Sequence, residues 1–405
     1  MIVRMVAGRT LASIAASTTR VGPVQTSDQV VSGSTESQAN VIWRTAATIS
    51  NFYVRVTSND RASSTFRIRK NTANGNGVIV VGASATGEFE DTTNSDSIAA
   101  GDNVCYNLVT GAGGTTFIYS VLAWTVSSDV WFGGQSYGGG TQVAGASVVN
   151  YYGLAGDGGN DTTENRSKTK FAYAGTLKNL YVNINTNGRS TTTNVRSRKN
   201  TANGNLLIAI GAGVTGVLED TANSDTIAVG DLVNLSITNG TATGTIVFHQ
   251  YKVEFTSTTG WMQTAHRGAG TALGAGATIF SSIGAFQTTA TESNWQTLSK
   301  GPYIARRLQA FISANATTGG SASVRFRKNA ANGNQLLSPG AGTTGFFEDT
   351  TNTDTFDVAD VIDVTVITGT GGNTTYRLLA VGLGPADFTA ERYGTNQAVT
   401  RASYF

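Results

Sequence analysis

Residues 69–76 read Arg-Lys-Asn-Thr-Ala-Asn-Gly-Asn, and the phrase returns at 198–205 and, with one change, at 327–334. The central asparagines, Asn71, Asn200 and Asn329, are 129 residues apart. Three acids downstream of each phrase keep the same spacing: Asp91, Asp220 and Asp349; Asp96, Asp225 and Asp354; Asp102, Asp231 and Asp360. This period is too long for a solenoid repeat and has the size of a whole domain. The sequence therefore predicts three copies of one module.

The repeated phrase has the pattern of a hairpin. Asn-Gly at 74–75, 203–204 and 332–333 is typical of a two-residue turn, because both residues tolerate positive φ. Before it, Phe66 and Ile68 fall on one face of an extended strand, and Arg67 and Arg69 on the other. The copies alternate in the same way. We therefore expect a turn between two antiparallel strands.

The next shared stretch, at 86–102 in the first copy, reads TGEFEDTTNSDSIAAGD. It predicts a turn at Gly87, a polar loop containing Asp91, Asn94 and Asp96, and a second turn at Gly-Asp. Ala359 replaces the glycine of that second turn in the third copy, so we expect no need for positive φ there. The loop oxygens could hold calcium. The loop lacks an EF-hand spacing, however, and Asp and Asn are ordinary turn formers, so no metal ligand is assigned.

Short strands, many turn signals and no helical periodicity predict an all-β protein. A module of about 129 residues suits an antiparallel β-sandwich of jelly-roll type with eight to ten strands. The expected organisation is therefore three tandem jelly-roll-like modules at 1–127, 128–257 and 258–385, followed by a C-terminal tail at 386–405. Three modules in one chain could also close around a pseudo-threefold axis.

Similar segments precede and follow the modules. Residues 129–147 and 260–278 resemble each other, and the two ends of the chain, 3–18 and 387–405, resemble them weakly. Three modules thus carry four versions of one segment. One terminal copy is expected to be spare and to dock on a neighbouring subunit or another protein by strand addition. The alternative is a tail with a chance similarity.

Composition excludes several classes of function. Charged residues make up 13% of the chain, and 28 basic residues nearly balance 26 acidic ones. Nucleic-acid binding needs concentrated Lys and Arg, so we expect no nucleic-acid partner. Disorder is disfavoured because 40% of the residues are hydrophobic. The chain shows no apolar run of membrane-spanning length and no signal-peptide pattern, which predicts a soluble protein without a membrane partner.

Catalytic motifs are missing from the sequence. It contains no P-loop, no His-Glu-x-x-His and no Gly-x-Ser-x-Gly elbow. His249 lies in a strand-like run, and His266 falls where the preceding copy has Tyr137. Cys105, the single cysteine, has Asn234 and Asp363 near its position in the other copies. We therefore expect no enzyme activity, no catalytic residue and no cofactor.

The stretches FRIRKNTANGN at 66–76 and ATGEFEDTTNSDSIAAGDNV at 85–104, with their copies, carry a family resemblance. They resemble jelly-roll domains of the tumour-necrosis-factor and C1q type, which occur in virion structural proteins of tailed bacteriophages. The resemblance implies a display or cementing role, usually as a trimer. This chain departs from that pattern because it holds three modules itself.

The predicted function is that of a non-enzymatic virion structural protein, namely a capsid decoration or cement protein that binds the outer capsid surface and stabilises the shell. One alternative is a phage tail fibre or receptor-binding protein. Another is a carbohydrate-binding or adhesive surface protein of a bacterium. The expected partners are the major capsid protein or other virion proteins, or a host surface glycan. The protein would be a monomeric pseudo-trimer or a homotrimer, assembled in the host cytoplasm and exposed on the particle surface.

Residues at equivalent positions of the modules are the candidate partner-binding groups. Trp131 and Trp261 recur in the linking segments, where exposed rings could stack on sugars or could pack the linkers. Phe405 ends the tail. The candidates are Arg67, Arg69, Asn74, Arg196, Arg198, Asn203, Arg325, Arg327, Asn332, Trp131, Trp261 and Phe405.

Overall fold

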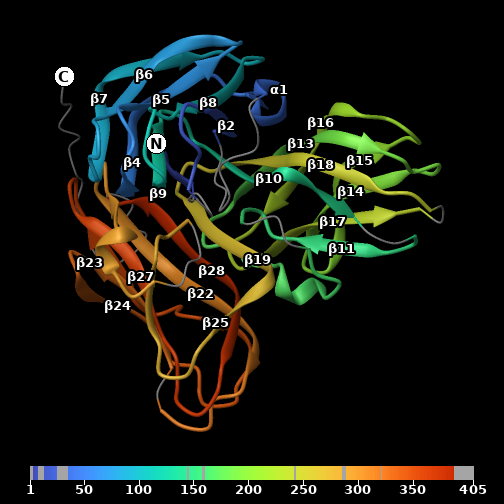
Figure 1. Cartoon of the computed structure of the whole chain (residues 1–405). Helices are drawn as coiled ribbons and strands as arrows, with labels where there is room; N and C mark the ends of the chain where they lie inside the picture. Colours follow the sequence, from blue (N-terminus) through green and yellow to red (C-terminus); the bar gives the residue numbers. More distant parts are fainter. Residues whose placement is uncertain are drawn as a thin grey trace, which may run out of the picture.

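The computed structural model describes residues 3–7, 13–24, 35–143, 146–156, 160–240, 243–284, 289–320 and 322–386. Strands dominate these ranges (Figure 1). The elements of repeat 1 (residues 3–126) are β1 (Val3–Ala7), β2 (Thr19–Pro23), α1 (Glu36–Ala39), β3 (Val41–Ile42), β4 (Ala47–Asn59), β5 (Ser64–Lys70), β6 (Ala73–Val81), β7 (Gly87–Ile98), β8 (Asn103–Val109) and β9 (Phe117–Val126).

The other two repeats have nearly the same element order. Repeat 2 (residues 130–256) contains β10 (Val130–Val143), β11 (Val149–Tyr152), η1 (Glu164–Arg166), β12 (Thr169–Lys170), β13 (Gly175–Asn187), β14 (Thr193–Lys199), β15 (Ala202–Ile210), β16 (Gly216–Ile227), β17 (Leu232–Asn239) and β18 (Ile246–Thr256). Repeat 3 (residues 261–385) contains β19 (Trp261–Leu273), β20 (Thr278–Ser281), η2 (Glu292–Asn294), β21 (Thr297–Leu298), β22 (Tyr303–Asn315), β23 (Ser323–Lys328), β24 (Ala331–Leu337), β25 (Gly345–Glu348), β26 (Thr353–Phe356), β27 (Val361–Ile367) and β28 (Thr374–Pro385). These ranges do not test the predicted domain boundaries, which stay predictions.

The described strands form six small antiparallel sheets, two in each repeat. The first sheets of the repeats have the orders β1-β9-β4-β7, β10-β18-β13-β16 and β19-β28-β22-β25. The second sheets have the orders β2-β8-β5-β6, β11-β17-β14-β15 and β20-β27-β23-β24. Strands that are neighbours in one sheet are rarely consecutive in the chain, so the two sheets of a repeat are interleaved along the sequence.

The all-β class agrees with the prediction, but the predicted arrangement is wrong. The six small sheets form one body around a shared core, with two interleaved sheets in each repeat, and not three separate tandem jelly-roll sandwiches. Period-2 patterns identify strands and their buried faces, whereas the packing of one sheet on another depends on contacts between distant residues.

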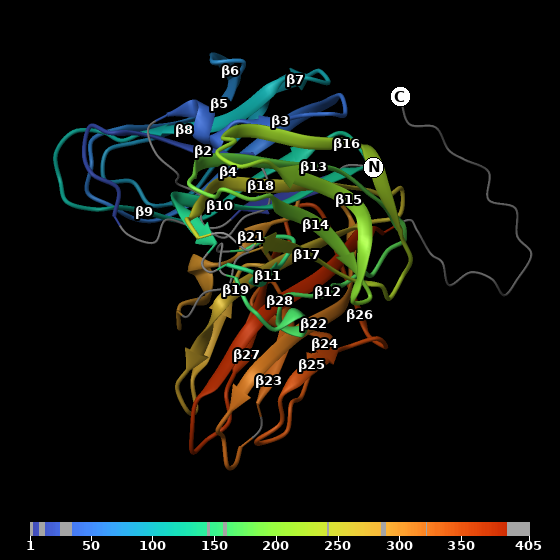
Figure 2. The same cartoon turned by 90° about the vertical axis from the view of Figure 1, so that its right-hand side faces the viewer.

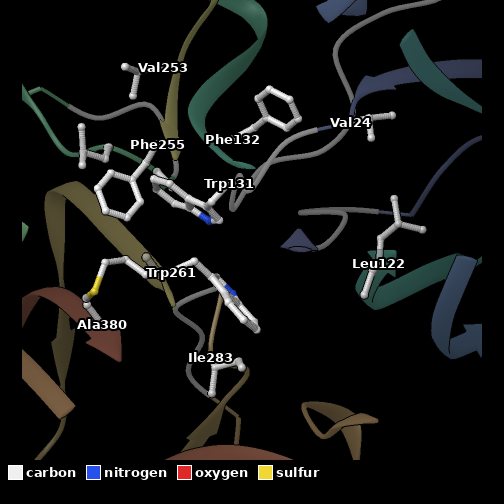
Figure 3. Close-up of a cluster of buried hydrophobic side chains, with 14 of the residues drawn as sticks. Val24, Leu122, Trp131, Phe132, Val253, Phe255, Trp261, Ile283 and Ala380 are labelled. Carbon is white, nitrogen blue, oxygen red and sulfur yellow. The ribbon is translucent and has the colours of Figure 1, made fainter. Parts of the chain in front are cut away.

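One hydrophobic cluster runs through all three repeats, which explains why they do not pack as separate tandem bodies. Figure 3 shows part of it, with Trp131 and Phe255 of repeat 2 near Trp261 of repeat 3, and Leu122 of repeat 1 and Ala380 of repeat 3 belong to the same cluster. Both tryptophans are fully buried. Figures 1 and 2 show the three repeats as lobes grouped around this cluster. The shared core therefore holds the lobes in one body.

The strand alternation predicted around the repeated phrase is confirmed, but the predicted turn position is wrong. Phe66 and Ile68 are buried and the arginines between them are partly exposed. The turn residues with positive φ are Asn71 and Thr72, three residues earlier than expected. Asn74 and Gly75 lie in β6. A Cβ on Gly75 would lie 2.6 Å from an Asp96 carboxylate oxygen, so this glycine permits a close approach.

The acidic stretch also differs from its prediction. Residues 87–98 form strand β7, and the three residues after Asp91 make an irregularity opposite β4 rather than a loop. Only in repeat 3 does the stretch divide, into β25 and β26. Ala359 has φ 71°, close to the glycines at the equivalent turns, so the expectation that positive φ is not needed there is wrong.

The N-terminal copy of the linking segment is used within repeat 1. β1 pairs with β9 from Val3 opposite Val126, as β10 pairs with β18 and β19 pairs with β28. The fourth copy, at 387–405, lies outside the described residues, as does the predicted docking strand. No helix in the described part of the chain has the length and apolar character needed to span a bilayer.

Candidate partner-binding face and the interfaces between repeats

Three of the candidate arginines hold the hairpin turn of their own repeat. Arg69 donates to Glu36 of α1 through Nε at 2.5 Å, and also to Asn74 Oδ1 and the Thr72 carbonyl. Arg198 and Arg327 make the equivalent contacts with Glu164 and Glu292 and with Asn203 and Asn332. The repeated Arg and Asn therefore fix the turn against the single-turn helix, a role that they would keep beside any partner.

The other three arginines lie on the outward face of the second sheet in each repeat. Arg67, Arg196 and Arg325 are partly exposed and alternate with buried neighbours on β5, β14 and β23. In repeat 3 this face is hollowed by a groove of about 450 Å³, whose lining includes Arg325, Arg327, Asn332 and Ile367. Val80 and Val109 are exposed on the same sheet of repeat 1. Positive charge and apolar surface thus occur together on these faces.

The other candidates have different positions. Of the two roles considered for Trp131 and Trp261, stacking on sugars and packing the linkers, burial favours packing: both have 0% exposure and lie in the central cluster (Figure 3). A sugar does not reach a ring in that position. Phe405 lies outside the described residues.

The shared acids act as acceptors for backbone N–H groups. Asp91 accepts from the backbone of Val78, Thr93 and Asn94, and Asp96 accepts from Asn76 and Gly77. Burial opposes the charged form of Asp91, but these N–H donors lower its pKa. The carboxylates therefore tie neighbouring strands together. Among the described residues no group of three or more His, Cys, Asp or Glu is placed to hold a metal ion.

The cysteine and the two histidines, which were considered as catalytic groups, are buried or partly buried in the structure. Burial raises the pKa of the Cys105 thiol to about 12, and the Glu36 carboxylate adds to this effect. His266 is fully buried, with Nε2 3.0 Å from the Arg166 carbonyl oxygen. His249 is partly buried, and burial lowers its pKa. These environments support structural roles for the three residues.

The interfaces between repeats contain a cyclic set of ion pairs. Arg44 of repeat 1 pairs with Glu219 of repeat 2, and Lys300 of repeat 3 pairs with Glu90 of repeat 1. Lys170 of repeat 2 lies 2.6 Å from Glu348 of repeat 3. The three glutamates are 129 residues apart and precede the shared aspartates. Each repeat therefore gives a cation to the next, and the head-to-tail contacts close into a ring within one chain.

Each interface also contains hydrogen bonds from the first sheet of one repeat to the backbone of the preceding one. Tyr181 and Gln250 donate to the Asn40 carbonyl at 3.0 and 2.6 Å. Arg55 donates to the Gln296 carbonyl at 3.0 Å. Gln309 makes two bonds with the backbone of Lys170, at 3.1 and 2.6 Å. The donors differ, but the segment bound is the same one in each repeat.

Among the described residues, a fully buried lysine and glutamate pair in the first sheet occurs at the interface between repeats 1 and 2 and at neither of the other two. Lys252 and Glu254 on β18 are fully buried and 2.9 Å apart, where repeat 1 has Ala123 and Thr125. Lys252 also donates to the Ile42 carbonyl at 2.6 Å, and Asn179 donates to Glu254 at 2.6 Å. Burial lowers the pKa of Lys252, and the Glu254 carboxylate opposes that shift.

Sequence reasoning missed the ion-pair ring. The signal was present for one side of it, because Glu90, Glu219 and Glu348 share the spacing of the acids beside them. The cations give a weaker signal. Arg44 and Lys300 occupy equivalent positions, but Ala172 stands there in repeat 2 and Lys170 supplies the charge from two residues earlier.

No protein-family model and no curated protein matches this chain. Among solved structures, one from "The Triple Jelly Roll Fold and Turret Assembly in an Archaeal Virus" is 12% identical, with a TM-score of 0.16, covering 95% of this chain and 91% of that chain. Another, from "Life in the extremes: atomic structure of Sulfolobus Turreted Icosahedral Virus", is 12% identical, with a TM-score of 0.18 and 92% of each chain covered. These weak neighbours are archaeal virus proteins, not proteins of tailed bacteriophages. Such low scores carry no argument about this chain's fold or function.

Proposed function

We propose that this chain is a non-enzymatic virion structural protein and, more specifically, a decoration or cement protein on the outer surface of a capsid. The observation that carries the proposal is the closed ring of equivalent contacts between repeats. Arg44–Glu219, Lys170–Glu348 and Lys300–Glu90 make one chain into a body with three similar outward faces. Such a body can seat on a local threefold site of a shell without forming a trimer.

The outward sheets offer the chemistry of a protein partner. Arg67, Arg196 and Arg325 repeat on these faces, and Val80, Val109 and Ile367 are exposed there at 60%, 42% and 38%. Arginine beside exposed apolar side chains is typical of protein interfaces. The partner is the major capsid protein or another virion protein, and the protein is exposed on the particle after assembly in the host cytoplasm.

The environment of the acids that recur every 129 residues supports a structural role. The carboxylate oxygens of the recurring aspartates accept hydrogen bonds from backbone N–H groups, and Cys105 is a buried thiol. The fibre or receptor-binding alternative gains no specific observation from the closed ring. The carbohydrate-binding alternative loses the tryptophans on which it depended, because both are buried.

The test uses particles from which this protein has been deleted. Purified protein is added back, its retention on sedimented shells is measured, and the temperature of genome release is recorded. We expect retention and a higher release temperature. Retention on detached tails only, or no retention with binding on a glycan array, would contradict a cement role.

Matched variants locate the contact. A triple variant, Arg67→Glu with Arg196→Glu and Arg325→Glu, should lose shell binding while keeping its melting temperature. A control, Val229→Glu with Val358→Glu, places acidic charge on exposed turns and should bind normally. Equal binding by both variants would exclude the outward sheets as the contact.

A further inference from the structure

The interface between repeats 2 and 3 contains a cavity of about 390 Å³. Repeat 2 lines it with Asn165, Lys168 and Lys170, and repeat 3 lines it with Phe311 of β22 and Phe346 of β25. The volume is within the range of small-molecule sites in proteins. The lining has two chemical halves, one made of lysines and one made of aromatic rings.

Phe311 accounts for this opening. At its equivalent position in repeat 2, Asn183 donates to the Ser37 carbonyl of repeat 1 at 2.8 Å. At its equivalent position in repeat 1, Arg55 donates to the Gln296 carbonyl of repeat 3 at 3.0 Å. Phenylalanine has no donor with which to bridge to the preceding repeat. A polar side chain at this position therefore bridges the other two interfaces, whereas at the interface between repeats 2 and 3 the Phe311 ring lines a cavity.

The charges at the cavity favour an anion. Lys168 has only 3% exposure, and its Nζ lies 2.7 Å from Asn165 Oδ1. Glu348 faces two cations, with Lys170 at 2.6 Å and Arg307 at 2.8 Å. Two cations thus share the Glu348 carboxylate, and Lys168 adds a third positive charge to the lining of the cavity.

Glu164, the carboxylate that acts on Lys168, does not neutralise the excess positive charge at the cavity. Glu164 raises the pKa of Lys168, whereas burial lowers it more strongly. Glu164 is itself paired with Arg198 at 3.0 Å. An ammonium that is almost fully buried with incomplete charge compensation gains from a bound negative group.

We propose that this cavity binds a small organic anion that carries an apolar ring or chain. Its acidic group contacts Lys168 and Lys170, and its apolar part packs between Phe311 and Phe346. The proposal is independent of the virion role, because it depends on one interface and not on the outward sheets. The two equivalent junctions do not offer the site: Asn40 and Ile42 replace the lysines in one, and Gln296 and Leu298 replace them in the other.

The probe is 8-anilinonaphthalene-1-sulfonate, an aromatic anion, titrated into the full chain by fluorescence and calorimetry. N-phenyl-1-naphthylamine, which has the same rings without the sulfonate, is the matched neutral probe. We expect one anion per chain and about tenfold weaker binding of the neutral probe, as the loss of one partly buried charge contact implies. Binding of three anions per chain, or equal binding of both probes, would overturn the proposal.

Variants connect the binding to the cavity. Phe311→Asn introduces the residue of repeat 2 and should abolish anion binding with little change in melting temperature. Phe346→Val introduces the residue of the equivalent position 217 and should weaken binding at least several-fold, which provides a second variant if the first does not fold. Asn183→Phe opens the junction between repeats 1 and 2, which lacks both lysines, and should add no second site. Unchanged binding in both the Phe311 and Phe346 variants would place the probe elsewhere and refute the site.

Discussion

The interface between repeats 1 and 2 and the interface between repeats 2 and 3 use the same backbone surfaces in different ways. The first is closed by a buried ion pair, Lys252 with Glu254, and by hydrogen bonds to the Asn40 carbonyl. The second has Ala380 and Gly382 at the positions of that pair, and Phe311 leaves a cavity. Duplication thus supplied one docking geometry, and later substitutions made each junction chemically distinct.

A buried ion pair is weak evidence for stability, but it can specify which surfaces meet. We therefore interpret Lys252 and Glu254 as the feature that distinguishes junction 1–2 from the other two. The hypothesis predicts a large cost when one partner is removed and a smaller cost when both are replaced by the residues of repeat 1.

The largest effect is expected for Lys252→Ala. It leaves Glu254 buried without its cation and leaves the Ile42 carbonyl without a donor. Breaking a buried pair in this way costs about 3–5 kcal/mol. Guanidinium unfolding monitored by tryptophan fluorescence should show the loss as a lower midpoint.

The matched variant is Lys252→Ala with Glu254→Thr, the pair found at 123 and 125. Asn51 donates to Thr125 in repeat 1, as Asn179 donates to Glu254, so threonine keeps an acceptor for Asn179. The double variant should recover at least half of the lost stability. If it is as unstable as the single variant, the lysine stabilises the junction by packing and not by compensating charge.

The second effect concerns the interior of the repeats, where Asp363 stands in place of Cys105 and Asn234. Burial and the Glu292 carboxylate raise the pKa of Asp363 to about 8, although Arg327 opposes the shift. The folded state then holds a proton that the unfolded state releases near pH 4. Stability from this group is full below pH 4 and is lost as pH rises to 8, by up to about 1.4 kcal/mol per pH unit.

Asp363→Asn should remove that dependence. The variant should gain stability relative to the wild type as pH increases from 5 to 8, and the gain should level off above 8. Asn234→Asp is the reverse control and should introduce a loss over the same range in repeat 2. A constant difference between wild type and Asp363→Asn across this range would show that Asp363 is charged in the folded protein.

The third effect separates the ion pairs of the ring. Glu348 has two cationic partners and a side-chain exposure of 7%, whereas Glu219 is paired with Arg44 and has a side-chain exposure of 13%. Glu348→Gln should cost about 2–3 kcal/mol because charge-assisted hydrogen bonds are lost. Glu219→Gln should cost about 1 kcal/mol, because its one partner, the partly exposed Arg44, can be solvated when the charge is removed. Thermal unfolding at low and high salt would measure both, and equal losses would contradict the comparison.

The sequence predicts the local parts of this structure well. The 129-residue period, the strands and the buried alternation of Phe66 and Ile68 follow from patterns within a few residues. The hairpin turn was misplaced because Asn-Gly is the stronger general signal, whereas here Asn71 carries the positive φ and Gly75 makes room for Asp96. The arrangement of the sheets, the burial of Trp131 and the ion-pair ring depend on which repeats meet, and no local pattern encodes that. The cavity could not be predicted for the same reason, because it forms only where Phe311 of repeat 3 lies beside Lys168 of repeat 2.

The smallest expected effect tests the one turn in which repeat 3 departs from the other two. Ala359 has φ 71°, where Gly101 and Gly230 have φ 98° and 93°. A residue with a Cβ is destabilised by about 1–2 kcal/mol in the left-handed region. Replacing it with glycine removes this strain, but the greater conformational freedom of glycine in the unfolded chain offsets part of the benefit. Ala359→Gly should therefore stabilise the protein by about 0.5–1 kcal/mol, measured as a higher midpoint of urea unfolding, while Gly230→Ala should destabilise it by a similar amount. If Ala359→Gly lowers the midpoint, the turn of repeat 3 is not strained, and its alanine is as suitable there as the glycines are in repeats 1 and 2.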